Sequence, residues 1–132
     1  MTDRIAPSLA DIESIARAAW AALPKQIRAL AGDIVFRVED YADDEVLAAL
    51  GMDDPFELTG LYQGVDLTQR SLADSGQLAP MVFLYRRAIL DEWIERGDVT
   101  LDELVAHVLV HEIGHHFGLS DEAMDAILDA AD

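Results

Sequence analysis

Apolar residues fall three or four positions apart in the segment that follows Pro7, as expected for a helix with one buried face. The apolar positions of this segment are Leu9, Ile12, Ala16, Ala19 or Trp20, and Leu23. Ser8 and Asp11 stand three residues apart at its start, which is the spacing of a capping box. Pro24 ends this helix, and a second short helix is predicted from there to Leu30.

The composition of the middle of the chain is typical of β-strands. Three segments rich in β-branched and aromatic residues predict strands, at residues 34–38, 58–65 and 81–85. Gly60 and Gly64 interrupt the second of these, which indicates a bulge or a close approach of the backbone to another element. Short helical patterns flank the strands at residues 43–50 and 86–96, and each ends at a glycine.

The longest apolar face begins after Thr100. Thr100 and Glu103 form a capping signal, and helical spacing then runs from Leu101 to Phe117, with Gly118 as the predicted end. Ser120 predicts the start of a last helix, whose buried positions are Ala123, Met124, Ile127 and Leu128. The whole pattern predicts a single α+β domain over residues 1–132, with helices flanking about three strands.

The charge and composition of the chain exclude some classes of binding partner and of metal ligand. The chain has 9 basic and 26 acidic residues, a net charge of −17 that repels phosphate backbones and anionic lipid heads. We therefore expect no nucleic-acid and no membrane partner. The chain has no cysteine, so any metal must be held by imidazole and carboxylate groups. Without a signal-peptide pattern or a run of about 18 apolar residues, a cytoplasmic protein is expected.

Residues 111–122, HEIGHHFGLSDE, carry three of the four histidines. His111 and His115 are four residues apart on a predicted helix, so both imidazoles lie on one face and can bind the same cation. Glu112 projects beside them, close enough to take a proton from a water molecule at the metal. The spacing therefore predicts two metal ligands and a general base.

Gly118 and Asp121 extend this motif. Because glycine adopts a left-handed conformation at little cost, Gly118 lets the chain turn sharply and bring Asp121 back as a third ligand. Glu122 and Asp125 are the alternatives for that ligand. Two imidazoles and one carboxylate leave a fourth position open, as in catalytic zinc sites. The same ligands can hold ferrous iron, but the adjacent base favours Zn²⁺.

The remaining candidates have more ordinary interpretations. His116 lies about 100° around the helix from His115, so we expect a rim histidine rather than a ligand, with support of a metal ligand or contact with the substrate as the alternatives. His107, one turn before His111, is expected to be a core or boundary histidine, or to form a hydrogen bond toward the site.

Two tyrosines and two arginines complete the set of candidates. Tyr62 and Tyr85 could stabilise an oxyanion, although strand aromatics usually pack in the core. Arg86 and Arg87 could grip a substrate carboxylate, but pairing with surface acids is the more ordinary role.

The string HEIGHHFGLSDE, with GLYQGVDLTQRS and MVFLYRRAIL upstream of it, resembles the minimal zincin-like metallopeptidase family, whose signature is HExxHxxGxxD. The resemblance implies a small mixed sheet packed on a backing helix and an active-site helix. It implies His111, His115 and Asp121 as zinc ligands, and Glu112 as the general base of a zinc-dependent peptidase. It also implies a peptide or protein substrate, bound in extended form along an edge strand formed by residues 58–65 or 81–85.

The chain differs from the best-known metzincins in two respects. Those proteins have a third histidine where this chain has Asp121, and a methionine turn well after the ligands. Here eleven residues follow Asp121, and Met124 lies close to it. The alternative function is therefore a catalytically weak or inactive zincin-fold module that binds metal or peptide, or a peptidase that needs a partner to complete its cleft. The sequence indicates no oligomeric state.

Overall fold

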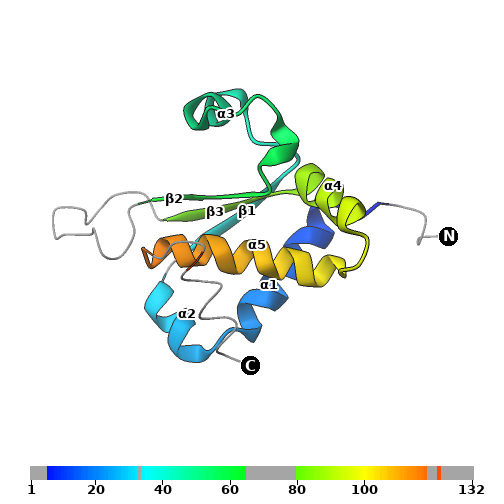
Figure 1. Cartoon of the computed structure of the whole chain (residues 1–132). Coiled ribbons are helices and arrows are strands. Elements are labelled where there is room, and N and C mark those ends of the chain that lie inside the picture. Colours follow the sequence, from blue (N-terminus) through cyan, green and yellow to red (C-terminus); the bar gives the residue numbers. More distant parts are fainter. Residues whose placement is uncertain (1–5, 33, 65–79, 119–121, 123–132) are drawn as a thin grey trace.

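The computed structural model of the chain describes residues 6–32, 34–64, 80–118 and 122. Figure 1 shows the order of the elements within these residues. Five α-helices and a 3₁₀-helix are described: α1 (Leu9–Ala22), α2 (Lys25–Ala31), α3 (Asp44–Leu50), η2 (Pro55–Glu57), α4 (Arg86–Arg96) and α5 (Leu101–His116). The described strands are β1 (Val35–Glu39), β2 (Gly60–Gln63) and β3 (Met81–Tyr85).

The three strands form one mixed sheet in the order β1-β3-β2. Strand β1 is parallel to β3, and its register runs from the pair Val35 and Met81 to the pair Glu39 and Tyr85. Strand β2 is antiparallel to β3, and Gly60 lies opposite Leu84. Of the two segments predicted as candidate edge strands, residues 81–85 are therefore central, and β2 forms the edge.

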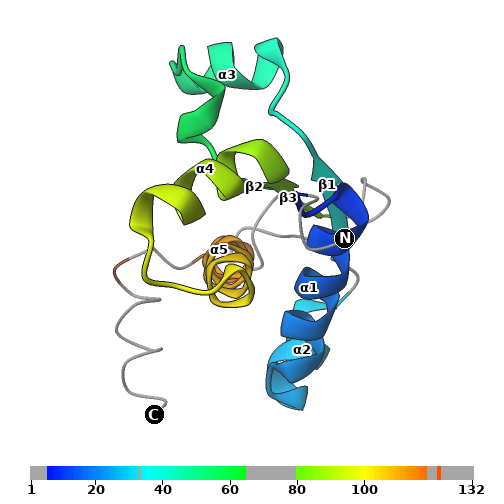
Figure 2. The same ribbon diagram turned by 90° about the vertical axis from the view of Figure 1, so that its right-hand side faces the viewer.

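Helices α1 and α5 pack against each other beneath one face of the sheet (Figure 1). Seen along α5, α1 and α2 lie on one side of it and α4 lies on the other (Figure 2). Six of the most deeply buried side chains come from α1, β3 and α5: Ile12, Ala16, Val82, Leu84, Val105 and Leu109. Since each large aliphatic side chain contributes about 1.5–3 kcal/mol when buried, this core fixes α5 against the sheet.

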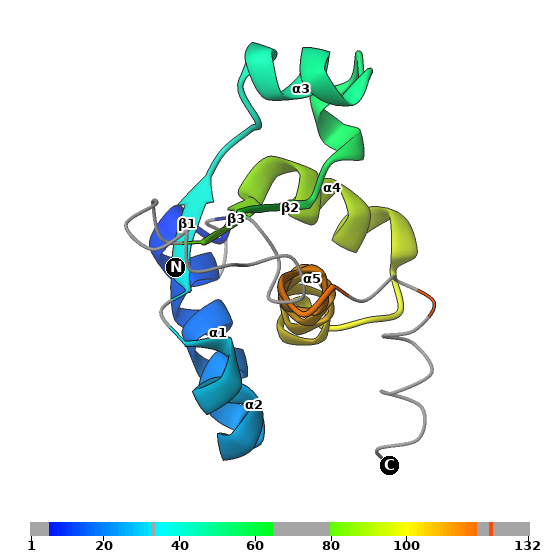
Figure 3. The same ribbon diagram turned by 90° about the vertical axis from the view of Figure 1, so that its left-hand side faces the viewer.

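A second, smaller apolar cluster lies above the sheet, where α3 stands in Figure 3. Its buried residues are Ala42, Leu47, Leu58, Tyr85 and Ala88. They join α3 and the segment after it to the end of β3 and the start of α4. The segment between β1 and β2 therefore forms a small lobe that is anchored to the sheet at Tyr85.

The predicted α+β class, the mixed sheet and the helix positions are confirmed within the described residues. The capping box of α1 forms as predicted, because Asp11 N donates to Ser8 Oγ at 3.1 Å and Ser8 N donates to Asp11 Oδ2 at 2.8 Å. The short helix η2 was not predicted. The last helix, predicted after Ser120, lies outside the described residues, apart from the helical Glu122. In the part of the chain that is described, no helix is long and apolar enough to cross a membrane.

Candidate active site

Helix α5 carries His111, Glu112 and His115 in its C-terminal half, where all three side chains are half-buried. Thr100 caps its N-terminus, and Thr100 Oγ1 accepts a hydrogen bond from Glu103 N at 3.0 Å. The residues that face the core are Leu101, Leu104, Val105, Val108, Leu109 and Ile113. Because these side chains anchor the helix, its rotation about its own axis is fixed, and with it the direction of the polar side chains.

His111 and His115 are both half-buried and lie one turn apart, as the spacing predicted. The Nε2 atom of His111 is shielded from solvent. The ring of His107 packs on the ring of His111, with centroids 4.3 Å apart and an angle of 41° between the planes. His107 is exposed, so of the positions expected for it the core is excluded. Three imidazoles thus follow one another along the helix, with His111 in the middle.

Glu112 lies against the edge strand at Gly60. A Cβ atom added at Gly60 would lie 2.7 Å from Val108 Cγ1, 3.2 Å from Glu112 Cγ and 3.3 Å from the Phe83 carbonyl oxygen. A side chain there would have to displace Val108, so the glycine allows β2 to lie directly on the helix. The close backbone approach predicted at this position is confirmed, and it places the stem of Glu112 next to the start of the edge strand.

The end of α5 forms as the sequence predicted. Gly118 has a φ of +76°, and its N–H donates to the His115 carbonyl at 3.0 Å. The chain therefore leaves the helix in a left-handed conformation three residues after His115. Asp121 and the alternative ligand Asp125 lie outside the described residues, whereas Glu122 is described and exposed.

Zinc suits the two donors that the structure does describe. Imidazole nitrogens are common zinc ligands, and His111 and His115 present two of them from successive turns of one rigid helix. Within the described residues, no group of three or more metal-binding side chains gathers, and the predicted third ligand lies outside them. The described half of the site therefore fits the ion by the identity and spacing of its donors.

His116 is fully buried, so its interpretation as a rim histidine was wrong. Its Nε2 lies 2.8 Å from the Ala31 carbonyl oxygen at the end of α2, and its Nδ1 lies 2.7 Å from the Tyr62 hydroxyl on β2. A carbonyl oxygen can only accept, so Nε2 carries the proton and Nδ1 of the neutral ring accepts from Tyr62. The helical rotation that separates His116 from His115 directs it inward, where it joins α5 to α2 and β2.

The two tyrosines that were candidates for oxyanion stabilisation have different surroundings. The Tyr62 hydroxyl donates to His116, so we assign it to this link rather than to a substrate. Tyr85 is 2% exposed. Burial, followed by the nearby carboxylates of Glu39, Asp43 and Glu112, raises the pKa of Tyr85 to about 12. Tyr85 therefore keeps its proton at neutral pH and lies within the electrostatic range of Glu112.

The two arginines after β3 are engaged elsewhere in the structure. Arg86 Nη1 lies 2.9 Å from Asp40 Oδ1, which confirms the predicted pairing with an acid, and Arg86 Nε donates to the Pro7 carbonyl. The guanidinium of Arg87 lies over the ring of Tyr41, 5.5 Å from its centroid. These contacts anchor the lobe and the N-terminal segment to α4.

A family model described as zincin-like metallopeptidase matches residues 31–130, which include all three strands and every predicted site residue. No curated protein matches the chain significantly.

Proposed function

Since the chain belongs to the zincin-like metallopeptidase family, we propose that it hydrolyses peptide bonds with one zinc ion held by His111, His115 and Asp121. The observation that carries this proposal is the placement of Glu112. Its stem contacts the edge strand at Gly60, on the same helix that presents the two imidazoles. The proposed base and the two proposed histidine ligands therefore lie on one helix, beside a strand that we propose receives the peptide.

The metal supplies the part of the chemistry that side chains alone do poorly. When bound, zinc polarises the scissile carbonyl and lowers the pKa of a water molecule toward about 7. His111 and His115 provide two nitrogen donors from a rigid helix, and Asp121 is our proposed third ligand. Three protein ligands leave one position for the substrate or the water, which distinguishes a catalytic site from a closed structural one.

Glu112 moves the proton. Its carboxylate accepts the proton of the attacking water and then delivers it to the amine that leaves. The side chain is half-buried between α5 and β2, so its position is restricted before a substrate arrives. A glutamine at this position keeps the shape and loses the basic oxygen.

We propose β2 as the strand that receives the substrate. Among the described strands it is one of the two outer strands of the sheet, and it pairs with β3 on one side (Figure 1). An extended peptide can pair with the main chain of such a strand, through hydrogen bonds to the peptide's backbone that do not depend on its side chains. Because Gly60 contacts Glu112, a peptide beside β2 runs past the proposed base.

The test measures zinc and cleavage separately. We expect wild-type protein to bind one zinc ion and to cleave members of a mixed peptide library, with cleavage abolished by a chelator and restored by zinc. E112Q should keep its zinc and lose at least 100-fold in turnover, a typical contribution of a general base. Asp121→Ala should bind zinc more weakly.

Two outcomes would contradict parts of this proposal. Wild-type turnover in E112Q would remove Glu112 from the mechanism, and unchanged zinc affinity in Asp121→Ala would remove Asp121 from the ligand set. Zinc binding without cleavage by the wild type would favour the alternative, a zincin-fold module that binds metal or peptide and does not hydrolyse it.

A further inference from the structure

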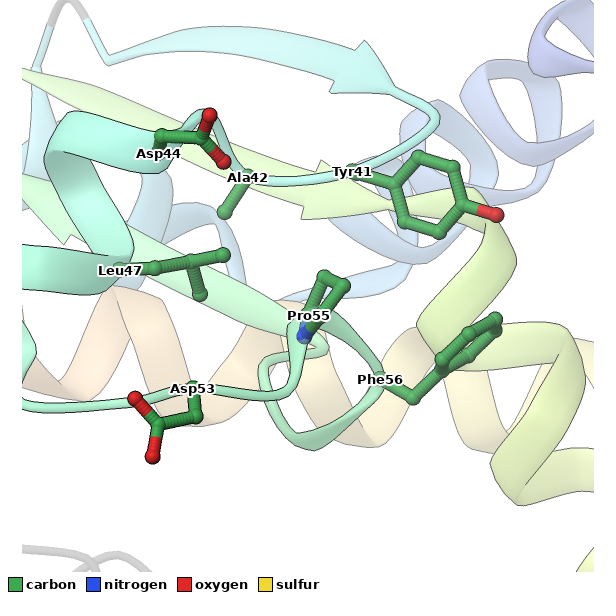
Figure 4. Close-up of a pocket in the computed structure, with 7 residues that line it drawn as sticks. All are labelled: Tyr41, Ala42, Asp44, Leu47, Asp53, Pro55 and Phe56. Atoms are coloured by element: carbon green, nitrogen blue, oxygen red, sulfur yellow. The ribbon is translucent and has the colours of Figure 1, made fainter.

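The lobe between β1 and β2 contains a pocket of about 390 Å³ (Figure 4). Its lining residues are Tyr41, Ala42, Asp44, Leu47, Asp53, Pro55 and Phe56. They come from the loop after β1, from α3, and from the segment that contains η2. The volume lies at the lower end of the range for ligand pockets, about 300–1,000 Å³, so it suits a side chain better than a large cofactor.

The lining has an apolar part and a charged part. The rings of Tyr41 and Phe56 meet edge to face, with centroids 5.6 Å apart, and Pro55 lies beside them. Figure 4 shows the carboxylates of Asp44 and Asp53 at the opposite end, with Leu47 between them. A ligand that fills this pocket therefore needs an apolar stem and a polar or charged tip.

The charge of the tip follows from the acids around the pocket. Residues 39–57 contain eight acidic residues and no lysine or arginine. Some of these acids hold the lobe together: Asp43 caps α3, Asp54 caps η2, and Asp40 pairs with Arg86. Among the described residues, Asp44 and Asp53 have no hydrogen bond or ion pair, which leaves both carboxylates available to a ligand.

We propose that this pocket binds the side chain of a lysine or an arginine in a peptide ligand. The aliphatic stem of such a side chain packs on Pro55 and the aromatic rings, and its cationic tip lies at the end of the pocket that carries Asp44 and Asp53. Arg87 already occupies a face of Tyr41 at the aromatic end. The cationic group of the ligand therefore lies at the carboxylate end, where Asp44 and Asp53 attract it, and not at the aromatic end, where Arg87 would repel it.

The pocket lies within a few residues of the proposed catalytic centre. Phe56 precedes Gly60 by four residues, so their Cα atoms are at most about 14 Å apart. Gly60 contacts Glu112, and the carboxylates of both Asp43 and Glu112 act on Tyr85. The aromatic end of the pocket therefore lies within about 14 Å of the residue that contacts Glu112, a distance that an extended peptide of about five residues spans. If the proposed function holds, the pocket selects substrates with a basic residue near the cleaved bond.

The experiment measures binding without relying on cleavage. Zinc-loaded E112Q protein is titrated with a blocked alanine heptapeptide that has one central lysine, and with the same peptide containing norleucine instead. Binding is followed by the NMR shifts of backbone amides. We expect the lysine peptide to shift the amides of Ala42, Asp44, Leu47 and Asp53, and to bind about threefold to tenfold more tightly than the norleucine peptide.

Two charge-matched variants separate the pocket from the overall charge. Asp44→Asn with Asp53→Asn, made in the E112Q protein, should remove the preference for lysine. Glu95→Gln with Asp98→Asn, at the far end of α4 from the lobe, changes the net charge equally and should alter the affinity less than twofold.

Equal affinity for the two peptides, or shifts that map away from the lobe, would overturn the proposal. So would an absence of saturable binding up to millimolar lysine peptide. Each of these results leaves the zinc ligands and Glu112 untouched, because those are tested by metal content and turnover. Conversely, a wild-type protein that cleaves nothing leaves the binding result intact.

Discussion

The link from Tyr62 through His116 to Ala31 allows the cost of one hydrogen bond to be predicted. Tyr62→Phe removes the hydroxyl that donates to Nδ1 of His116 at 2.7 Å, and it keeps the aromatic ring. His116 is 0% exposed, so in the folded variant no water molecule can reach Nδ1 to replace the lost donor. An acceptor buried without its partner costs about 1–3 kcal/mol, and we expect a loss of about 2 kcal/mol in the free energy of unfolding.

The assay is urea unfolding of Tyr62→Phe beside wild type. With a slope of about 1–3 kcal/mol per molar urea, a loss of about 2 kcal/mol lowers the midpoint by roughly 1 M. Tyr41→Phe is the matched control, since Tyr41 is 37% exposed and the chemical change is the same. It should stay within about 0.5 kcal/mol of wild type.

The link also bears on the metal site, because His116 follows the proposed ligand His115 directly. If the last turn of α5 loosens in Tyr62→Phe, zinc affinity measured by chelator competition should fall several-fold. A Tyr62→Phe protein as stable as Tyr41→Phe would refute the reasoning, because it would mean that the buried hydrogen bond contributes nothing net.

Two further predictions concern the neighbourhood of Glu112. Gly60→Ala places a methyl group 2.7 Å from Val108 Cγ1 and 3.2 Å from Glu112 Cγ. Thermal melts should therefore show a loss of about 1–3 kcal/mol in the free energy of unfolding, and zinc-dependent turnover should fall as well. An unchanged melt would argue against the tight contact. The pKa of Tyr85 is raised from 10.0 to about 12, so unfolded chains lose this proton first, and the free energy of unfolding should fall by roughly 2–3 kcal/mol between pH 10 and 12. In Tyr85→Phe the free energy of unfolding should not show this fall between pH 10 and 12. An equal fall in both proteins would mean that other groups cause it.

Local pattern predicted the elements well where one face of a segment is buried. Helices α1 and α5 follow from apolar spacing and from the caps at Ser8 and Thr100, because those signals act within a few residues of chain. The spacing of His111 and His115 and the left-handed Gly118 were predictable for the same reason.

Contacts between distant segments were not predictable in this way. Strand order decides which segment is the edge, and neither residues 58–65 nor residues 81–85 carry a local mark of it. His116 has partners 54 and 85 positions away along the chain, so its burial follows from the packing of α2 and β2 around α5. The pocket in the lobe depends in part on η2, a turn of three residues that apolar periodicity does not reveal.

The order of the strands has a consequence for how the protein acquires its structure. Both outer strands precede the central one along the chain, and Val35 pairs with Met81, 46 residues later. As the chain emerges from the ribosome, β1 and β2 have no strand to pair with in this sheet until β3 has been made. Pairings of such long range slow folding, because the entropy of closing the loop is lost before any contact forms. We therefore expect the sheet to assemble late and in one step, with the platform for α5 completed only when most of the chain has been synthesised.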